Sequence, residues 1–173
     1  MAITGEMKAN HFASKQFASG QFTPEQARGK LLLDHAYLGE LLKQVGRLAY
    51  RWLDGESAAA APLREAILAL GEPLSAHLDF EDLFLPKIIG HAPWGPMHVL
   101  HARVNHAHQS DCLRHLEAQA RDLASDENSL TSLAEEALAL VRELVQDIAR
   151  EEHDLVHPDV LGAPASPAST TLD

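Results

Sequence analysis

The chain has 173 residues, of which 46% are hydrophobic and 5% aromatic, and its formal net charge at pH 7 is −11. This length suffices for one domain with a sizeable core, and the abundance of Leu and Ala favours helices over strands. The acidic balance argues against binding to nucleic acid or to a membrane surface, and no apolar run is long enough to span a bilayer. The single cysteine, Cys112, excludes an internal disulfide and suits a reducing cytoplasm, where we expect the protein to be located.

Residues 1–22 show no hydrophobic period and are interpreted as an N-terminal extension, partly disordered or loosely packed. Thr23, Pro24 and Gln26 then form the pattern of a capping box and predict a helix over about 24–53. Its apolar line consists of Leu31, Leu38, Leu42, Val45, Ala49 and Trp52.

A second helix is predicted over about 59–85. Pro73 should kink or split it, and Pro86 should end it, because proline removes a helical hydrogen bond. After a loop at 88–96, the apolar periodicity predicts a third helix over 96–123 and a fourth over 130–157. We therefore expect an all-α, up-down-up-down four-helix bundle at 23–160, followed by a disordered tail at 161–173 that is rich in Ala, Ser and Pro.

Polar side chains interrupt the apolar stripe of every helix. In the second helix His77 and Glu81 lie one turn apart on the buried face, and a glutamate is rarely buried without a partner. The other helices place further ligand-type side chains on or beside their stripes: His35 in the first, His106 in the third, and Asp147 and Glu151 in the fourth. A metal ion is an economical way to satisfy several buried polar groups at once.

Three segments carry a family resemblance. They are LDHxxLxxLL at 33–42, HxxxED at 77–82 followed by Pro86, and IAREE at 148–152 followed by Leu155 and Pro158. Over about 24–160 the chain resembles the hemerythrin-like family of HHE cation-binding domains. That resemblance maps His35, His77 and Glu81 directly onto family ligands.

The resemblance implies a cofactor of two irons bridged by carboxylates, here Glu81 and Glu151, with His35, His77 and His106 as terminal ligands. An open position would accept dioxygen or another small diatomic molecule. It implies a binding protein for oxygen or redox sensing, or for iron sensing or storage, rather than an enzyme. Where the family has a histidine in the fourth helix, this chain has Asp147. More oxygen ligation favours iron or manganese and argues against reversible oxygen carriage.

The histidines of the third helix leave an alternative open. His106 continues the apolar line, whereas His101 would be the ligand if the phase of the helix were different. A second line at heptad spacing, His101, His108 and His115, is interpreted as a solvated face or as a contact surface, for example in a homodimer. His153 and His157 lie off the stripe and are interpreted as surface residues.

Other classes of protein fit less well. A ferritin-like di-iron enzyme requires Glu-x-x-His pairs, and no histidine of this chain has a glutamate three residues before it. The His-Glu-x-x-His motif of zinc hydrolases is also absent from the sequence. The remaining alternative is a metal-free or single-metal helical bundle that acts as a protein-interaction module.

Overall fold

The computed structural model describes residues 22–122 and 127–161, and it confirms the all-α four-helix bundle. The helices are α2 (Pro24–Leu53), η2 (Ser57–Ala59), α3 (Ala60–Ile89), α4 (Gly95–Arg121), α5 (Glu127–Leu155) and α6 (Pro158–Leu161). Residues 1–21 of the predicted extension and residues 162–173 of the predicted tail lie outside the described residues, while Leu161 belongs to α6.

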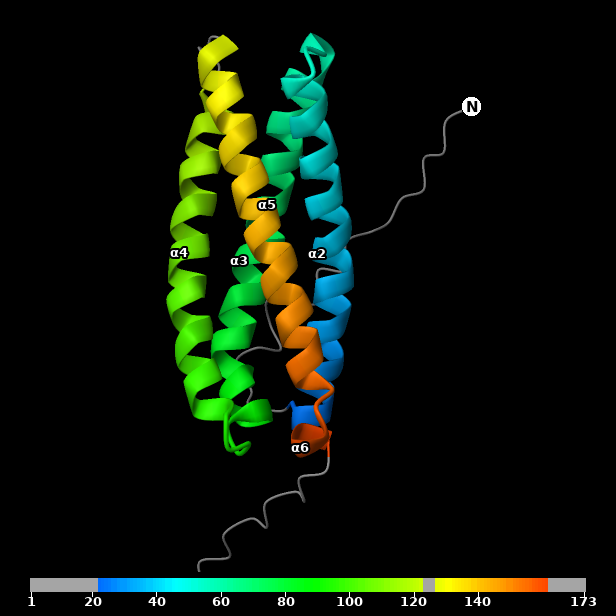
Figure 1. The fold of residues 1–173 in the computed structure, drawn as a ribbon, viewed down its shortest axis with the longest axis vertical. Helices are drawn as coiled ribbons and strands as arrows, with labels where there is room; N and C mark the ends of the chain where they lie inside the picture. Colours follow the sequence, from blue (N-terminus) through cyan, green and yellow to red (C-terminus); the bar gives the residue numbers. More distant parts are fainter. Residues whose placement is uncertain (1–21, 123–126, 162–173) are drawn as a thin grey trace, which may run out of the picture.

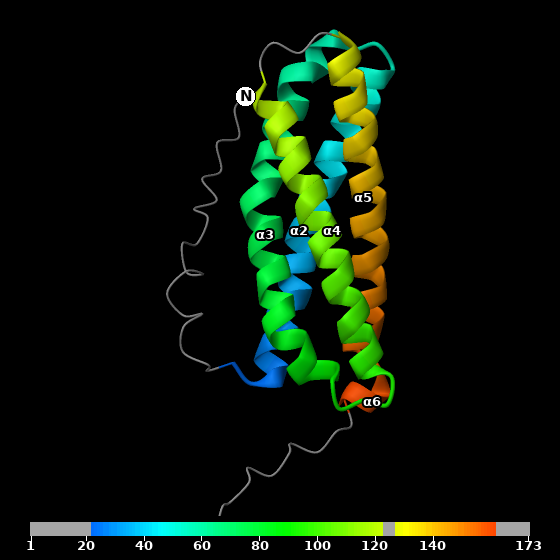
Figure 2. The same cartoon turned by 90° about the vertical axis from the view of Figure 1, so that its left-hand side faces the viewer.

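The four long helices run alternately up and down (Figures 1 and 2). α2 packs against α3 and α5, and α4 packs against the same two helices from the other side. The segments between successive long helices are short and lie at alternating ends of the bundle. Within the described part of the chain, no helix combines the length and apolarity needed to cross a membrane.

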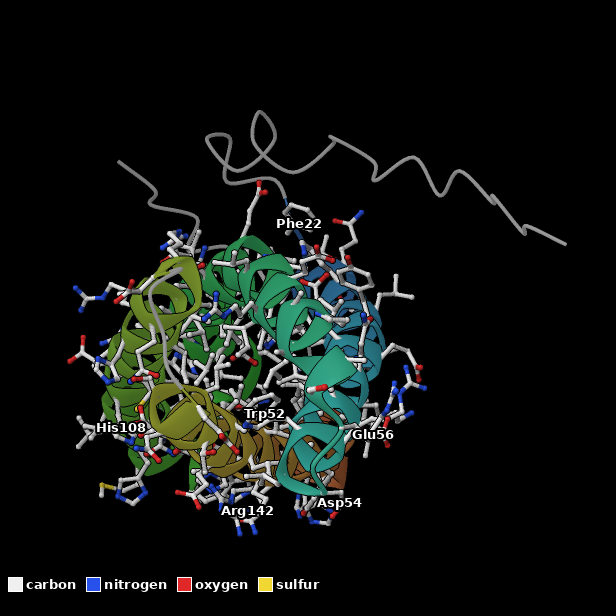
Figure 3. The ribbon with its side chains drawn as sticks, turned by 90° about the horizontal axis from the view of Figure 1, so that it is seen from above. Phe22, Trp52, Asp54, Glu56, His108 and Arg142 are labelled. Atoms are coloured by element: carbon white, nitrogen blue, oxygen red, sulfur yellow. The ribbon has the colours of Figure 1, made fainter. Side chains whose placement is uncertain are left out.

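The capping box predicted for α2 is confirmed. The Thr23 hydroxyl accepts a hydrogen bond from the Gln26 backbone N–H at 3.3 Å, and the Gln26 side chain accepts one from the Thr23 N–H at 2.9 Å. After α2 the chain turns at Gly55, whose φ of +90° lies in the region that favours glycine. Figure 3 looks down on this upper end, where Trp52 Nε1 donates to Thr131 Oγ1 at 3.4 Å and joins α2 to α5.

One expectation for α3 is wrong: the helix continues past Pro86 to Ile89. At Pro73, where a kink or a split was expected, the helix is not split. The buried residues Leu74 and Ile88 lie beyond these prolines, so tertiary packing outweighs the roughly 3 kcal/mol that a proline costs inside a helix. The loop before α4 is correspondingly shorter than predicted, and α5 begins and ends a few residues earlier than expected, at Glu127 and Leu155.

The buried interior is divided into two apolar clusters. The upper apolar cluster contains residues of all four long helices, among them Leu42, Leu74, Leu116 and Leu133. The lower apolar cluster contains Leu31, Phe80, Phe84, Ile89 and Leu155. Phe22, at the start of the described chain, packs edge-on against the rings of Phe80 and Phe84, at centroid distances of 5.6 and 5.5 Å. Buried polar side chains accompany these clusters: His35 on α2, His77 and Glu81 on α3, and His106 and Gln109 on α4.

Candidate metal centre

A layer of polar side chains separates the two apolar clusters. We call His35, His77, Glu81, His106 and Glu151 the polar layer. His35 comes from α2, His77 and Glu81 from α3, His106 from α4 and Glu151 from α5. The first four are at most 4% exposed, which is as little as the leucines around them. All four long helices therefore contribute to one buried layer.

The three histidines direct their Nε2 atoms to the Glu81 carboxylate. Glu81 Oε1 lies 3.5 Å from His35 Nε2, while Glu81 Oε2 lies 3.3 Å from His77 Nε2 and 3.2 Å from His106 Nε2. Glu151 is arranged in the same sense, with Oε2 3.5 Å from His35 Nε2 and Oε1 3.9 Å from His106 Nε2. Each carboxylate thus presents one oxygen towards His35 and the other towards His106.

The opposite ring nitrogen of each histidine faces a second carboxylate from a neighbouring helix. The Nδ1 distances are 3.8 Å from His77 to Asp34, 2.8 Å from His106 to Asp82 and 3.6 Å from His35 to Glu152. Metal-binding histidines commonly have such a partner, because it fixes the ring orientation and makes Nε2 a better ligand. We call Asp34, Asp82 and Glu152 the outer carboxylates.

Sequence reasoning missed the outer carboxylates, although a signal for them exists. Each one is the immediate sequence neighbour of a polar-layer residue: Asp34 precedes His35, Asp82 follows Glu81, and Glu152 follows Glu151. Each nevertheless faces a histidine on a different helix from its own. The doublets are visible in the sequence, but their partners are not.

Several atoms of the layer lack hydrogen bonds to any described residue. They are both ring nitrogens of His35, Nδ1 of His77, Oε1 of Glu81 and Nε2 of His106. An unsatisfied buried polar atom costs about 1–3 kcal/mol, and more where the group is charged. Three of these atoms, His35 Nε2, Glu81 Oε1 and His106 Nε2, lie on the inner side of the layer, where a cation would satisfy them together. The two Nδ1 atoms face outer carboxylates instead.

Burial and the neighbouring charged groups together determine the pKa values of the layer. Burial lowers the pKa of His35, but the carboxylates of Glu151 and Glu81 outweigh it and raise that pKa to about 9. Burial likewise lowers the pKa of His106, but the nearby carboxylates outweigh it and raise that pKa to about 10. Burial would raise the pKa of Glu81, but the neighbouring His106 and His35 lower it well below its usual range. The carboxylates therefore attract positive charge to this layer.

The spacing of the donors suits a metal ion. His35, His77, Glu81 and Glu151 each offer one ligand atom, and these atoms lie within 4.8 Å of one another. Ligand atoms bound at about 2.1 Å to one cation lie roughly 3.0–4.2 Å apart, and the distances measured between the histidines and the carboxylates fall in that range. Imidazole nitrogens and carboxylate oxygens together suit iron, zinc or manganese.

Asp147 lies beside this group rather than within it. Its Oδ2 accepts a hydrogen bond from Gln109 Nε2 at 2.5 Å, and its Oδ1 is 2.8 Å from the Arg150 guanidinium. Gln109 is 1% exposed, and it is a further buried polar residue whose pairing with α5 was not predicted. Of the two histidine candidates in α4, the structure brings His106 into the layer and leaves His101 on the outside of the helix.

A cavity of about 150 Å³ adjoins the layer between α4 and α5. Asp147 and Glu151 are among its lining residues, together with His101, Asn105 and Arg150. His153 is exposed and His157 packs against the Trp94 ring, so neither contributes to the layer.

Comparisons with protein-family models, with curated proteins and with solved structures gave no match for this chain.

Proposed function

We propose that this protein is a non-haem iron-binding protein of hemerythrin type, with two irons held in the polar layer. One observation carries the proposal: three buried Nε2 atoms converge on Glu81 and Glu151 while each Nδ1 faces an outer carboxylate. Buried imidazoles satisfied only by one another would not need this double set of acids. The resemblance of the helix motifs to the HHE family agrees with the same assignment.

Two metal ions fit the way the carboxylates are turned. Glu81 and Glu151 each direct one oxygen to His35 and the other to His106, as bridging carboxylates between two cations would. His77 adds a nitrogen close to Glu81 Oε2, on the side of His106. In this arrangement His35, His77 and His106 would hold the metal as terminal ligands.

The side of the layer facing α5 is where a small molecule would bind. The family has a histidine where this chain has Asp147, so no nitrogen ligand comes from this position, and the Asp147 carboxylate contacts Gln109 and Arg150. The 150 Å³ cavity has Glu151 in its wall and gives room for a diatomic molecule beside the layer. We propose sensing of oxygen or redox state, or iron sensing or storage, in preference to oxygen carriage or catalysis.

A metal-free interaction bundle would have to keep the polar layer for another reason. Its protonated histidines offset the carboxylates, but the unsatisfied atoms would remain. Aliphatic side chains of similar volume would fill the same space without this desolvation penalty. The cost of the layer therefore favours the metal-binding function.

Metal analysis of the full chain purified from iron-supplied cells tests the proposal. We expect about two irons per chain, because Glu81 and Glu151 each lie between His35 and His106 and could bridge two ions. The His77→Ala, Glu81→Ala double variant should lose them while circular dichroism shows most of the helix retained. His153→Ala, which removes an exposed histidine of α5, is the matched control and should keep the full iron content. Wild-type iron content in the double variant would refute the site.

Spectra of the reduced and air-exposed protein test the choice between sensing and carriage. We expect oxidation of the iron in air without a stable oxygen adduct, because Asp147 stands where the family has a histidine and the site therefore has one nitrogen donor fewer. A charge-transfer band that appears with oxygen and disappears on its removal would contradict this part of the proposal and indicate an oxygen carrier.

A further inference from the structure

A second group of metal-ligating side chains lies on the surface of the bundle. His108 and Cys112 are four residues apart on α4 and therefore share one face of that helix. Glu143 of α5 lies next to them across the helix interface. Figure 3 shows His108 on the outside of the bundle, on the side where α4 and α5 are neighbours. None of these three residues belongs to the polar layer.

The three side chains meet at one imidazole nitrogen. Cys112 Sγ and Glu143 Oε2 each lie 3.6 Å from His108 Nε2. In a tetrahedral zinc site, bond lengths of about 2.3 Å to sulfur and about 2.0–2.1 Å to nitrogen or oxygen place sulfur roughly 3.5 Å, and oxygen roughly 3.3 Å, from the nitrogen. These two spacings to His108 Nε2 are close to those that a bound zinc ion would impose. The three ligand atoms do not all lie within 4.8 Å of one another, so the side chains would have to rotate to close on the ion.

The surroundings favour a cation and leave it accessible. His108, Cys112 and Glu143 line a pocket of about 420 Å³ that also contains Asp111 and Glu136. Burial raises the pKa of the Cys112 thiol, and the carboxylates of Glu143, Asp111 and Glu136 raise it further, so the local potential is negative. The side chains of His108 and Glu143 are 63% and 35% exposed and can rotate to complete a coordination sphere.

A neighbouring pair in the same pocket is already satisfied. His115 Nε2 lies 3.3 Å from Glu136 Oε2 and 2.7 Å from the Gln119 amide. Glu136 also accepts a hydrogen bond from Ser132 at 2.8 Å. His115 and Glu136 therefore have partners without a metal, whereas a cation between His108, Cys112 and Glu143 would replace their long contacts with bonds.

We propose that His108, Cys112 and Glu143 form a surface site for a borderline-soft divalent cation such as Zn²⁺, with the fourth position open to the pocket. Thiolate and imidazole ligands select zinc-like ions, whereas the polar layer offers imidazole and carboxylate ligands without a thiolate, which also suit harder ions such as iron and manganese. The molecule thus has two metal sites of different preference, one between the four helices and one between α4 and α5.

Titration of the full chain with Co²⁺ tests this site directly. Cys112 is the only cysteine of the chain, so a thiolate-to-cobalt charge-transfer band reports on this site alone. We expect the band to saturate at one cobalt per chain and to be displaced by Zn²⁺. The His77→Ala, Glu81→Ala variant should show the same band, which separates the fate of this proposal from that of the iron site.

Single substitutions then identify the ligands. Cys112→Ser should abolish the band, and His108→Ala and Glu143→Ala should each weaken cobalt binding at least tenfold, as for loss of one ligand of three. His115→Ala is the matched control, a histidine on the same helix and in the same pocket, and should leave the affinity unchanged. Absence of the band, unchanged affinity in both ligand variants, or saturation at half an equivalent with dimer formation would each overturn the proposal.

Discussion

The upper apolar cluster and the polar layer are built by the same four helices and both contain fully buried residues, but they affect stability in opposite ways. Leu42 and Glu81 are both 1% exposed. Burial of an aliphatic side chain contributes about 1.5–3 kcal/mol to folding, whereas burial of a carboxylate opposes folding unless it is fully partnered. The cluster therefore holds the bundle together, whereas the layer costs stability unless a partner such as the proposed metal satisfies it.

The largest effect expected from this difference is loss of the metal on changing Glu81. Glu81→Ala removes the carboxylate on which all three Nε2 atoms converge, so stoichiometric metal binding should disappear. The metal-free protein should stay folded, since the apolar clusters are untouched. Metal content and far-ultraviolet circular dichroism of the same sample check both statements. Unfolding of the variant would show that the layer contributes to folding as the cluster does.

The complementary change is Leu133→Ala in the upper apolar cluster. Leu133 is 1% exposed and lies in α5, more than four turns before Glu151 in the sequence. Its truncation should lower the free energy of unfolding by about 2–5 kcal/mol because it leaves a cavity. The metal content per folded chain should remain that of the wild type. Denaturant unfolding together with metal analysis measures the two quantities, and a loss of metal would mean that the two regions are coupled.

In the metal-free protein, the stability contributed by the polar layer should depend on pH, whereas that contributed by the upper apolar cluster should not. Because the pKa values of His35 and His106 are raised to about 9 and about 10, their contribution to stability is full below the unfolded value of about 6.5 and is lost as pH rises through 9–10. The pKa of Glu81 is lowered, so its contribution is present above about 4.5 and is lost as pH falls towards its folded pKa. Metal-free stability should therefore be greatest between about pH 4.5 and 6.5.

Metal binding should show the opposite dependence above neutral pH. The metal must displace the protons of His35 and His106, so its affinity should rise between about pH 6.5 and 9 while the stability of the metal-free protein falls. Thermal unfolding of metal-free and metal-loaded samples at pH 6 and pH 9 measures both trends. Leu133→Ala should shift all four melting temperatures downwards without changing the trends. A metal-free protein that becomes more stable from pH 6.5 to 9 would contradict the charge pairing in the layer.

The sequence predicts the fold and the inner part of the layer for a definite reason. Helix α2 was predicted with the residues that begin and end it, because Thr23, Pro24 and Gln26 act locally. His35, His77, Glu81, His106 and Glu151 interrupt apolar stripes, and a stripe reveals which face is buried.

What the sequence could not predict depends on contacts between helices. Pro86 does not end α3 because the residues after it are buried against other elements. Each outer carboxylate contacts a histidine of a different helix. The periodicity within one helix cannot reveal such a contact. The contact between His108 and Glu143 was hidden in the same way, since the heptad line of α4 says nothing of its neighbour α5.

The smallest effect concerns an outer carboxylate. Asp82 Oδ1 lies 2.8 Å from His106 Nδ1, and Asp82→Asn keeps an oxygen that accepts this hydrogen bond but removes the charge. Loss of such a partner weakens metal binding about 10–100-fold, and we expect the lower part of that range because the hydrogen bond is retained. Asp79→Asn, an exposed aspartate on the same helix, should leave the affinity unchanged. Competition with a chelator of known affinity measures both variants. If Asp82→Asn binds metal as tightly as Asp79→Asn does, the outer carboxylates only orient the rings of a structural core, and the difference between the layer and the cluster is confined to the five residues of the layer itself.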